Sequence, residues 1–146
     1  MRAADAAVVV VDAVAGVEVQ TEKVWEFCNE FSLPRMFVIN KMDRDNASSE
    51  RSLASLEESF GRGAVPVEIP MGAEREFSGV ISLLNNKAYR YARDGSGKFQ
   101  EEEVPAEYKE ELARMREKLV EMVAESNDAL MEKFFAEATL DQADMI

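Results

Sequence analysis

The sequence predicts an α/β fold, in which a layer of parallel strands and helices is followed by a mixed α+β part. This prediction rests mainly on two short runs of β-branched and apolar residues, residues 6–11 and 36–39. Uninterrupted apolar runs of this length are typical of strands in a parallel sheet that are buried on both faces. Each run is followed by a helical pattern, and the alternation of strand, helix, strand and helix indicates a parallel α/β layer.

In the first part, residues 7–12 and 36–40 are expected to form adjacent parallel strands. Between them, apolar side chains recur at helical spacing and predict an amphipathic helix that ends before Pro34; they are Val24, Phe27, Cys28 and Phe31. A second helix is expected over residues 49–60, ending at Gly61. The functional loops of such a layer lie at the carboxyl ends of its strands, here residues 12–16 and 40–43.

The pattern changes after Gly63. Residues 65–70, 79–84 and 88–91 predict strands, expected to pair antiparallel. A long helix is expected over residues 105–126, with proline at its first position, and its apolar stripe comprises Tyr108, Leu112, Met115, Leu119, Met122 and Val123. A further helix should contain Leu130, Phe134 and Phe135, and residues 140–146 should begin another.

Composition excludes several classes of function. The 146 residues include 17 basic and 29 acidic side chains, for a net charge of −12, so direct binding of a nucleic-acid backbone is not expected. The chain has no histidine and one cysteine, which excludes an internal disulfide and a Cys/His metal cluster. No apolar run approaches the ~20 residues of a membrane helix. Residues 63–146 carry 18 of the acids and 10 of the bases, which suggests either a basic partner or simply a solvated acidic surface.

One loop carries recognisable chemistry. Asn40, Lys41 and Asp43 form an N-K-x-D pattern directly after a predicted buried strand. Guanine presents two adjacent donors, N1–H and the N2 amino group, and a fixed carboxylate such as Asp43 can accept both. Adenine lacks this donor pair and would leave the charge unpaired. Asn40 would hold the loop and reach the base edge, Lys41 would lie over the purine ring, and Met42 is expected to be free to vary.

The motif is short, and chance is the competing explanation. Three fixed residues recur on the order of once in a hundred chains of this length. Its position at a strand's carboxyl end, with a strand–helix unit upstream, favours the functional interpretation. The sequence contains no G-x-x-x-x-G-K-[ST] loop, so it has no segment that would cradle phosphates.

Several segments resemble translational GTPases, and elongation factor G in particular. They are residues 12–22, 40–44, 66–72, 77–81 and 118–121. The resemblance covers essentially the whole chain. It implies that residues 1–62 are part of a P-loop-type G domain and that residues 63–146 are the subdomain that elongation factor G carries inserted in it. Ser82, where the family usually has aspartate, and residues 46–49 depart from the pattern and suggest a divergent paralogue.

The resemblance also implies a function. The intact protein would be a cytoplasmic, ribosome-associated GTPase that drives translocation and binds GTP or GDP with magnesium through segments outside this chain. The chain itself is expected to be an internal piece that has guanine-binding residues Asn40, Lys41 and Asp43, no catalytic or metal-binding residue and no tightly bound nucleotide, and that hydrolyses no GTP. The ribosomal stalk proteins are the expected partner of its acidic second part.

Two alternatives remain open. The first is a related ribosomal GTPase, either a release factor or a tetracycline-resistance ribosomal protection protein, with the same insertion. The second is a non-enzymatic acidic interaction module whose long helices dock a partner. Other residues have plainer explanations: Cys28 fits a helix core, and Asp12 fits a strand-end carboxylate that supports its loop.

Overall fold

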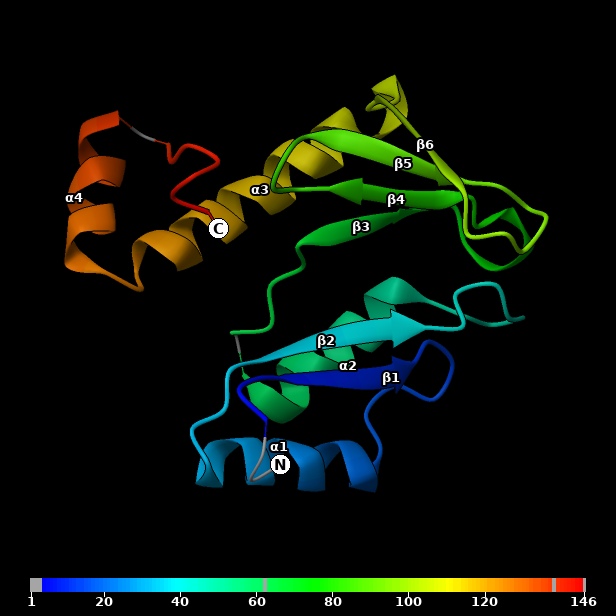
Figure 1. The fold of residues 1–146 in the computed structure, drawn as a ribbon, viewed down its shortest axis with the longest axis horizontal. Coiled ribbons are helices and arrows are strands. Elements are labelled where there is room, and N and C mark those ends of the chain that lie inside the picture. Colours follow the sequence, from blue (N-terminus) through cyan, green and yellow to red (C-terminus); the bar gives the residue numbers. More distant parts are fainter. Residues whose placement is uncertain (1–3, 62, 138, 146) are drawn as a thin grey trace. The chain divides into compact units, whose positions relative to one another are not determined.

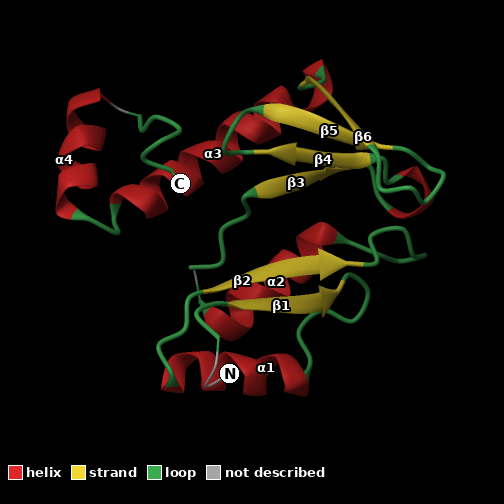
Figure 2. Cartoon of the chain, viewed as in Figure 1, coloured by secondary structure: helices red, strands yellow, loops and turns green. Residues whose placement is uncertain are grey.

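The computed structural model describes residues 4–61, 63–137 and 139–145, and it shows a mixed α/β chain (Figures 1 and 2). Its elements follow in the order β1 (Ala7–Asp12), α1 (Val19–Glu30), β2 (Arg35–Asn40), α2 (Ser49–Phe60), β3 (Glu68–Met71), η1 (Glu74–Glu76), β4 (Gly79–Ser82), β5 (Lys87–Tyr91), β6 (Phe99–Glu103), η2 (Ala106–Tyr108), α3 (Lys109–Ala124) and α4 (Asp128–Glu137). The α/β class expected from the sequence is confirmed. None of the described helices is long and apolar enough to cross a membrane.

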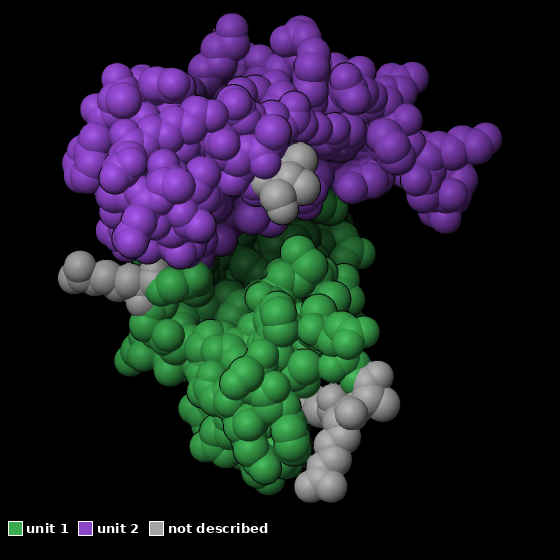
Figure 3. Space-filling view, turned by 60° about the vertical axis from the view of Figure 1, so that its left-hand side comes forward, with its two compact units in different colours: residues 1–64, 73–77 green, residues 65–72, 78–146 purple. Residues whose placement is uncertain are grey.

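The chain divides into two compact units, coloured separately in Figure 3. Unit 1 comprises residues 1–64 and 73–77, and unit 2 comprises residues 65–72 and 78–146. The short segment 73–77 therefore belongs to unit 1, although β3 and β4 on either side of it belong to unit 2. Arg62, where the sequence-based boundary was drawn, lies outside the described residues.

Unit 1 is built on the parallel pair of β1 and β2, whose register runs from Ala7 opposite Arg35 to Asp12 opposite Asn40. Phe37 of β2 stacks on Trp25 of α1 at 5.6 Å and on Phe60 of α2 at 5.5 Å between ring centroids. Both helices therefore pack against the face of the sheet that carries Phe37. The expected parallel pairing of the two strands is confirmed.

The expectation that these strands are buried on both faces is wrong. Val9 and Val11 are buried, but Val8 and Val10 are 61% and 59% exposed. Met36 and Val38 of β2 share this exposure. The physical reason is that α1 and α2 cover one face of the pair, and no described element of unit 1 covers the other.

The apolar stripe assigned to the first helix is also partly wrong. Cys28 is fully buried, as expected, but Phe27 is 49% exposed. Thr21 is buried and Trp25 makes the aromatic contacts, so the packed face of α1 is rotated from the predicted one. A side chain one position away on a helix points about 100° elsewhere, and the large ring of Trp25 decides which face is used.

Unit 2 is a four-stranded antiparallel sheet in the order β3, β4, β5, β6, with α3 packed on it. Its core contains Met71, Ile81, Leu83 and Leu119, all nearly inaccessible to solvent. The predicted stripe of the long helix is confirmed, because all six of its residues pack against this core. The helix itself begins at Lys109, after a single 3₁₀ turn that follows Pro105.

The further helix expected to contain Leu130, Phe134 and Phe135 is confirmed as α4, in which Phe135 is 79% exposed. Two details of unit 2 differ from the expectations. Strand β6 was not predicted, because its Gln-Glu-Glu-Glu sequence has weak strand propensity. Residues 142–145 form turns instead of a helix start, and Ile146 lies outside the described residues. Cross-strand ion pairs of Arg90 with Glu102 and of Lys87 with Glu103 join β6 to the sheet.

Candidate guanine-binding site

The two predicted functional loops meet at the carboxyl ends of β1 and β2. Asp12 lies directly opposite Asn40 in the register, and the Ala13 amide donates to the Asn40 carbonyl at 2.9 Å. The parallel pairing thus brings residues far apart in sequence to one edge of the sheet. This is the edge at which sheets of this type hold their ligands.

Asp12 connects both loops. One of its carboxylate oxygens accepts hydrogen bonds from the amides of Val14, at 2.8 Å, and Ala15, at 3.3 Å. The other accepts from Lys41 Nζ at 2.5 Å. The hydrogen bond from Lys41, followed by that from the Val14 amide, lowers the pKa of Asp12 to about 2. Asp12 therefore remains ionised at neutral pH and supports its loop, as the sequence indicated.

The loop after Asp12 packs against α2. The Val17 amide donates to Ser55 Oγ at 2.9 Å. Gly16 adopts a φ of +71°, and a Cβ at this position would lie 3.0 Å from Ser55 Oγ. The positive φ favours glycine here, and the close approach of Ser55 adds to this preference.

Asn40 and Lys41 shape the start of the guanine motif. Asn40 Oδ1 accepts a hydrogen bond from the Lys41 amide at 2.8 Å. Lys41 itself has a φ of +63°, an uncommon conformation for a residue with a side chain. The side chain of Asn40 thus supports a sharp turn at the end of the strand, and the side chain of Lys41 is directed to Asp12.

Met42 is not free to vary, contrary to the expectation from the motif. It is only 7% exposed and forms a small core with Ala13 and Ala47, against which Ile39 and Phe77 pack. The reason is geometric: the turn at Lys41 directs the next side chain inward. Met42 therefore anchors the motif, while Lys41 and Asp43 on either side of it are exposed.

Asp43 is exposed and has no side-chain hydrogen bond or ion pair within the described part of the chain. A carboxylate with free acceptor positions suits the paired N–H donors of a guanine edge. The structure thus places all three predicted guanine-binding residues in one turn at the sheet edge. The structure also pairs the Asp12 carboxylate with the Lys41 ammonium group.

Segment 73–77, which the sequence reasoning missed, also contacts this loop. The Glu74 amide donates to the Met42 carbonyl at 2.9 Å, and Glu74 Oε1 accepts from the Asn46 amide at 2.8 Å. Arg75 lies 3.7 Å from the Asp45 carboxylate, with both side chains well exposed. Nothing in the local sequence indicates this contact, because the segment lies about thirty residues away along the chain.

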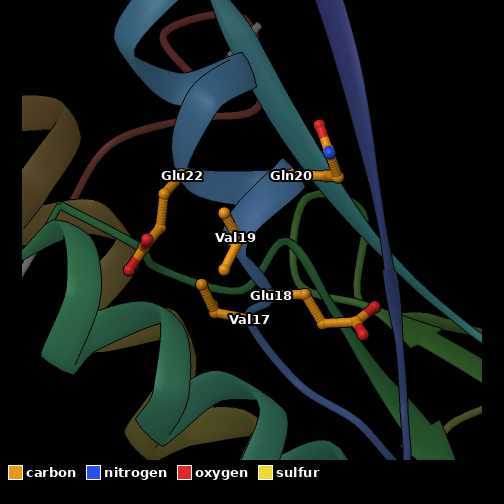
Figure 4. A pocket seen from close by; sticks show the side chains of 5 residues that line it. All are labelled: Val17, Glu18, Val19, Gln20 and Glu22. Carbon is orange, nitrogen blue, oxygen red and sulfur yellow. The ribbon is translucent and has the colours of Figure 1, made fainter.

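A hollow of about 490 Å³ elsewhere in unit 1 does not belong to this site. It is lined by Val17, Glu18, Val19, Gln20 and Glu22, at the start of α1 (Figure 4). The carboxylates of Glu18 and Glu22 point in opposite directions in this view. With two acids and no basic side chain, its lining does not suit a nucleotide phosphate.

Comparisons with known proteins identify the family of the chain. Residues 1–142 match the family described as the elongation factor Tu GTP binding domain. The chain is 38% identical to elongation factor G of Mycoplasma pneumoniae over 145 residues, which is 99% of this chain and 21% of that protein. A crystal structure from Thermus thermophilus superposes with a TM-score of 0.81 at 36% identity, covering 92% of this chain and 20% of that one. The chain thus spans about a fifth of the length of these relatives, and it belongs to the family of GTP-binding domains of the elongation factor Tu type.

Proposed function

We propose that this chain is the guanine-reading part of a longer translational GTPase of the elongation factor G kind, acting on cytoplasmic ribosomes. The observation that carries the proposal is the carboxylate of Asp43, which has no side-chain partner among the described residues and lies in a structured turn at the carboxyl edge of a parallel strand pair. Asp43 accepts N1–H and N2–H of guanine, Lys41 lies along the purine, and Asn40 maintains the turn. Residues 1–62 are the G-domain portion and residues 63–146 the inserted subdomain.

Phosphate binding and hydrolysis belong to other segments of that protein. GTP and GDP in this class are held chiefly by backbone amides, a lysine and magnesium around the phosphates. This sequence has no loop of that kind. The residues described above therefore supply base recognition, and none of them is assigned a catalytic or magnesium-binding role.

A second role, docking a basic partner, is favoured by the outer face of α3. Glu110, Glu117 and Glu121 are exposed there, while the opposite side of the helix packs on the core of unit 2. Arg114 and Lys118 interrupt this face, so its field is mixed. We propose the ribosomal stalk proteins as the partner, with the contact acting on association rate more than on affinity.

The test of base recognition is Asp43→Asn in the intact GTPase. The amide converts one acceptor into a donor, so affinity for GDP should fall by roughly a hundredfold. Xanthine nucleotide, which replaces the matching donor by a carbonyl, should bind better to the variant than to the unmodified protein. Titration calorimetry with GDP and xanthosine diphosphate measures both changes.

Asp45→Asn is the matched control, because Asp45 is an exposed carboxylate in the same loop and pairs only weakly with Arg75. Its nucleotide preference should equal that of the unmodified protein. An Asp43→Asn variant that keeps full preference for GDP would show that Asp43 does not face the base.

A further inference from the structure

The turn formed by residues 73–77 brackets the guanine loop at both ends. Its Glu74 residue binds the backbone of Met42 through its own amide, at 2.9 Å, and the backbone of Asn46 through its carboxylate, at 2.8 Å. Asp43 lies between these two attachment points. One residue thus restrains both ends of the five-residue stretch that carries the guanine-reading carboxylate.

The bracketed stretch has few supports of its own. Within the loop, the Arg44 amide donates to the Lys41 carbonyl at 3.2 Å and the Ala47 amide to the Arg44 carbonyl at 3.1 Å. Asn46 has a φ of +66°, a conformation that costs free energy unless its surroundings hold it. The Asn46 amide donates a hydrogen bond to the Glu74 carboxylate, and the Asn46 carbonyl accepts one from the Arg51 side chain. Both backbone groups of Asn46 are therefore hydrogen-bonded.

Apolar packing reinforces the bracket. Phe77, at the end of the same turn, packs against the small core of Ala13, Met42 and Ala47. The turn is also anchored by the strands that flank it, because the Ser78 amide donates to the Met71 carbonyl at 2.9 Å. The segment is therefore a fixed support for the loop.

We propose that Glu74 is a positioning residue for guanine recognition, acting through the backbone of Met42 and Asn46 on the direction of the Asp43 carboxylate. The proposal rests on the proposed function of Asp43. Two hydrogen bonds to guanine require a fixed carboxylate, since a mobile one gains only part of their combined free energy.

The structural link is tested by amide hydrogen exchange, measured by NMR on this chain. In Glu74→Ala the Asn46 amide loses its acceptor and should exchange at least roughly tenfold faster. Glu74→Gln keeps a side-chain carbonyl oxygen and should restore most of the protection. Glu76→Ala removes an exposed carboxylate from the same turn and is the matched control, with no expected change. Unchanged Asn46 exchange in Glu74→Ala would overturn the proposal.

The functional link is tested in the intact GTPase with GDP and inosine diphosphate, which lacks the N2 amino group and offers Asp43 a single donor. Glu74→Ala should lower GDP affinity roughly tenfold and the preference for GDP over inosine diphosphate by at least about threefold. Glu74→Gln should recover most of both losses. Equal weakening of the two nucleotides would show that Glu74 only stabilises the fold, and would overturn its role in positioning.

The two proposals fail in different ways. If Asp43→Asn leaves nucleotide preference unchanged, the assignment of Asp43 fails, and the positioning role of Glu74 fails with it. If Asp43→Asn shifts preference to xanthine while Glu74→Ala leaves the GDP preference intact, guanine recognition stands and the inference about Glu74 alone is wrong.

Discussion

Asp12 shows how a single side chain can organise a site that it does not itself form. Its carboxylate accepts from two amides of its own loop and from Lys41 of the neighbouring loop. Met42 also stabilises the motif, since its buried side chain packs against Ala13 and Ala47. The hydrogen bonds of Asp12 and the apolar packing of Met42 therefore stabilise the turn that contains Lys41 and Asp43.

The lowered pKa of Asp12 predicts a pH dependence of stability. The folded-state pKa of about 2 lies below the ordinary value of 3.8, so the contribution of Asp12 is fully present above about pH 4. It should be lost as the pH falls from there toward 2. Compared with Asp12→Asn, the unmodified chain should have the higher melting temperature at neutral pH, and this difference should shrink across that window.

Melting curves of both proteins, followed by Trp25 fluorescence as a reporter of unit 1, measure this difference. Asp43→Asn is the control, because Asp43 has no side-chain partner in the described residues. This substitution should leave the fall in melting temperature at low pH unchanged. A constant difference between the Asp12→Asn variant and the unmodified chain from pH 7 to pH 2 would contradict the assignment.

At the scale of elements, close strand pairing and charge decide the architecture of unit 2. A Cβ at Gly79 would lie 2.0 Å from the carbonyl oxygen of Tyr89, so β4 and β5 can pair only with glycine at this position. Strand β6 is acidic and joins the edge of the sheet through Arg90 and Lys87. Helix α3 then covers one face of the sheet and leaves Glu110, Glu117 and Glu121 exposed to solvent.

Gly79→Ala should destabilise unit 2 by about 3 kcal/mol, because the added methyl group forces the two strands apart. Gly63→Ala is the control: apart from the glycine and its chain neighbours, no described residue has an atom within 4 Å of the added Cβ, and the change should stay within about 0.5 kcal/mol. Urea unfolding followed by circular dichroism measures both. Equal midpoints for the two variants would mean that the strands can shift to accept a side chain.

The acidic face of α3 predicts salt-dependent docking. Reversing Glu110, Glu117 and Glu121 to lysine in the intact GTPase should slow association with ribosomes at least roughly tenfold at low salt. The effect should fade as salt shortens the screening length below ~10 Å. Ribosome-stimulated GTP hydrolysis at several salt concentrations measures it.

Reversal of Glu50, Glu57 and Glu58, exposed glutamates on α2, is the matched control. If the α3 variant keeps the rate and salt dependence of the unmodified protein, the helix is a spacer and the docking proposal is wrong.

At the scale of the whole molecule, the proposed function separates base recognition, assigned to this chain, from phosphate binding, assigned to other segments of the GTPase. Unit 1 contains Asn40, Lys41 and Asp43, and residues 73–77, which follow β3 of unit 2 in the sequence, contact the loop that these residues form. Neither unit supplies a phosphate loop, since the sequence has none.

The chain alone should therefore bind GDP weakly and hydrolyse no GTP. Base contacts contribute two charge-assisted hydrogen bonds, whereas most affinity in this class comes from amides, lysine and magnesium at the phosphates. Titration calorimetry with GDP and magnesium should show a dissociation constant weaker than about 1 mM. Micromolar binding would contradict the prediction, and the intact GTPase measured in parallel is the positive control.

Much of the local structure followed from the sequence because its causes are local. The β-branched runs predicted β1 and β2, Gly61 marked the end of α2, and the apolar spacing predicted the packed stripe of α3. The motif at the end of β2 gave Asn40, Lys41 and Asp43 as candidates from residue type and spacing alone. Strand β6 was not predicted, because cross-strand pairing rather than intrinsic strand propensity stabilises it.

Only the tertiary structure decided which faces are covered and what holds the loop. Periodicity cannot tell that α1 and α2 leave Val8 and Val10 exposed, since that depends on which elements pack against the sheet. It cannot place Glu74 beside Asn46, because a hydrogen bond between distant segments leaves no pattern in either. The sequence by itself determined the chemistry of the guanine motif; the fold decided its support, through contacts that are non-local in the chain.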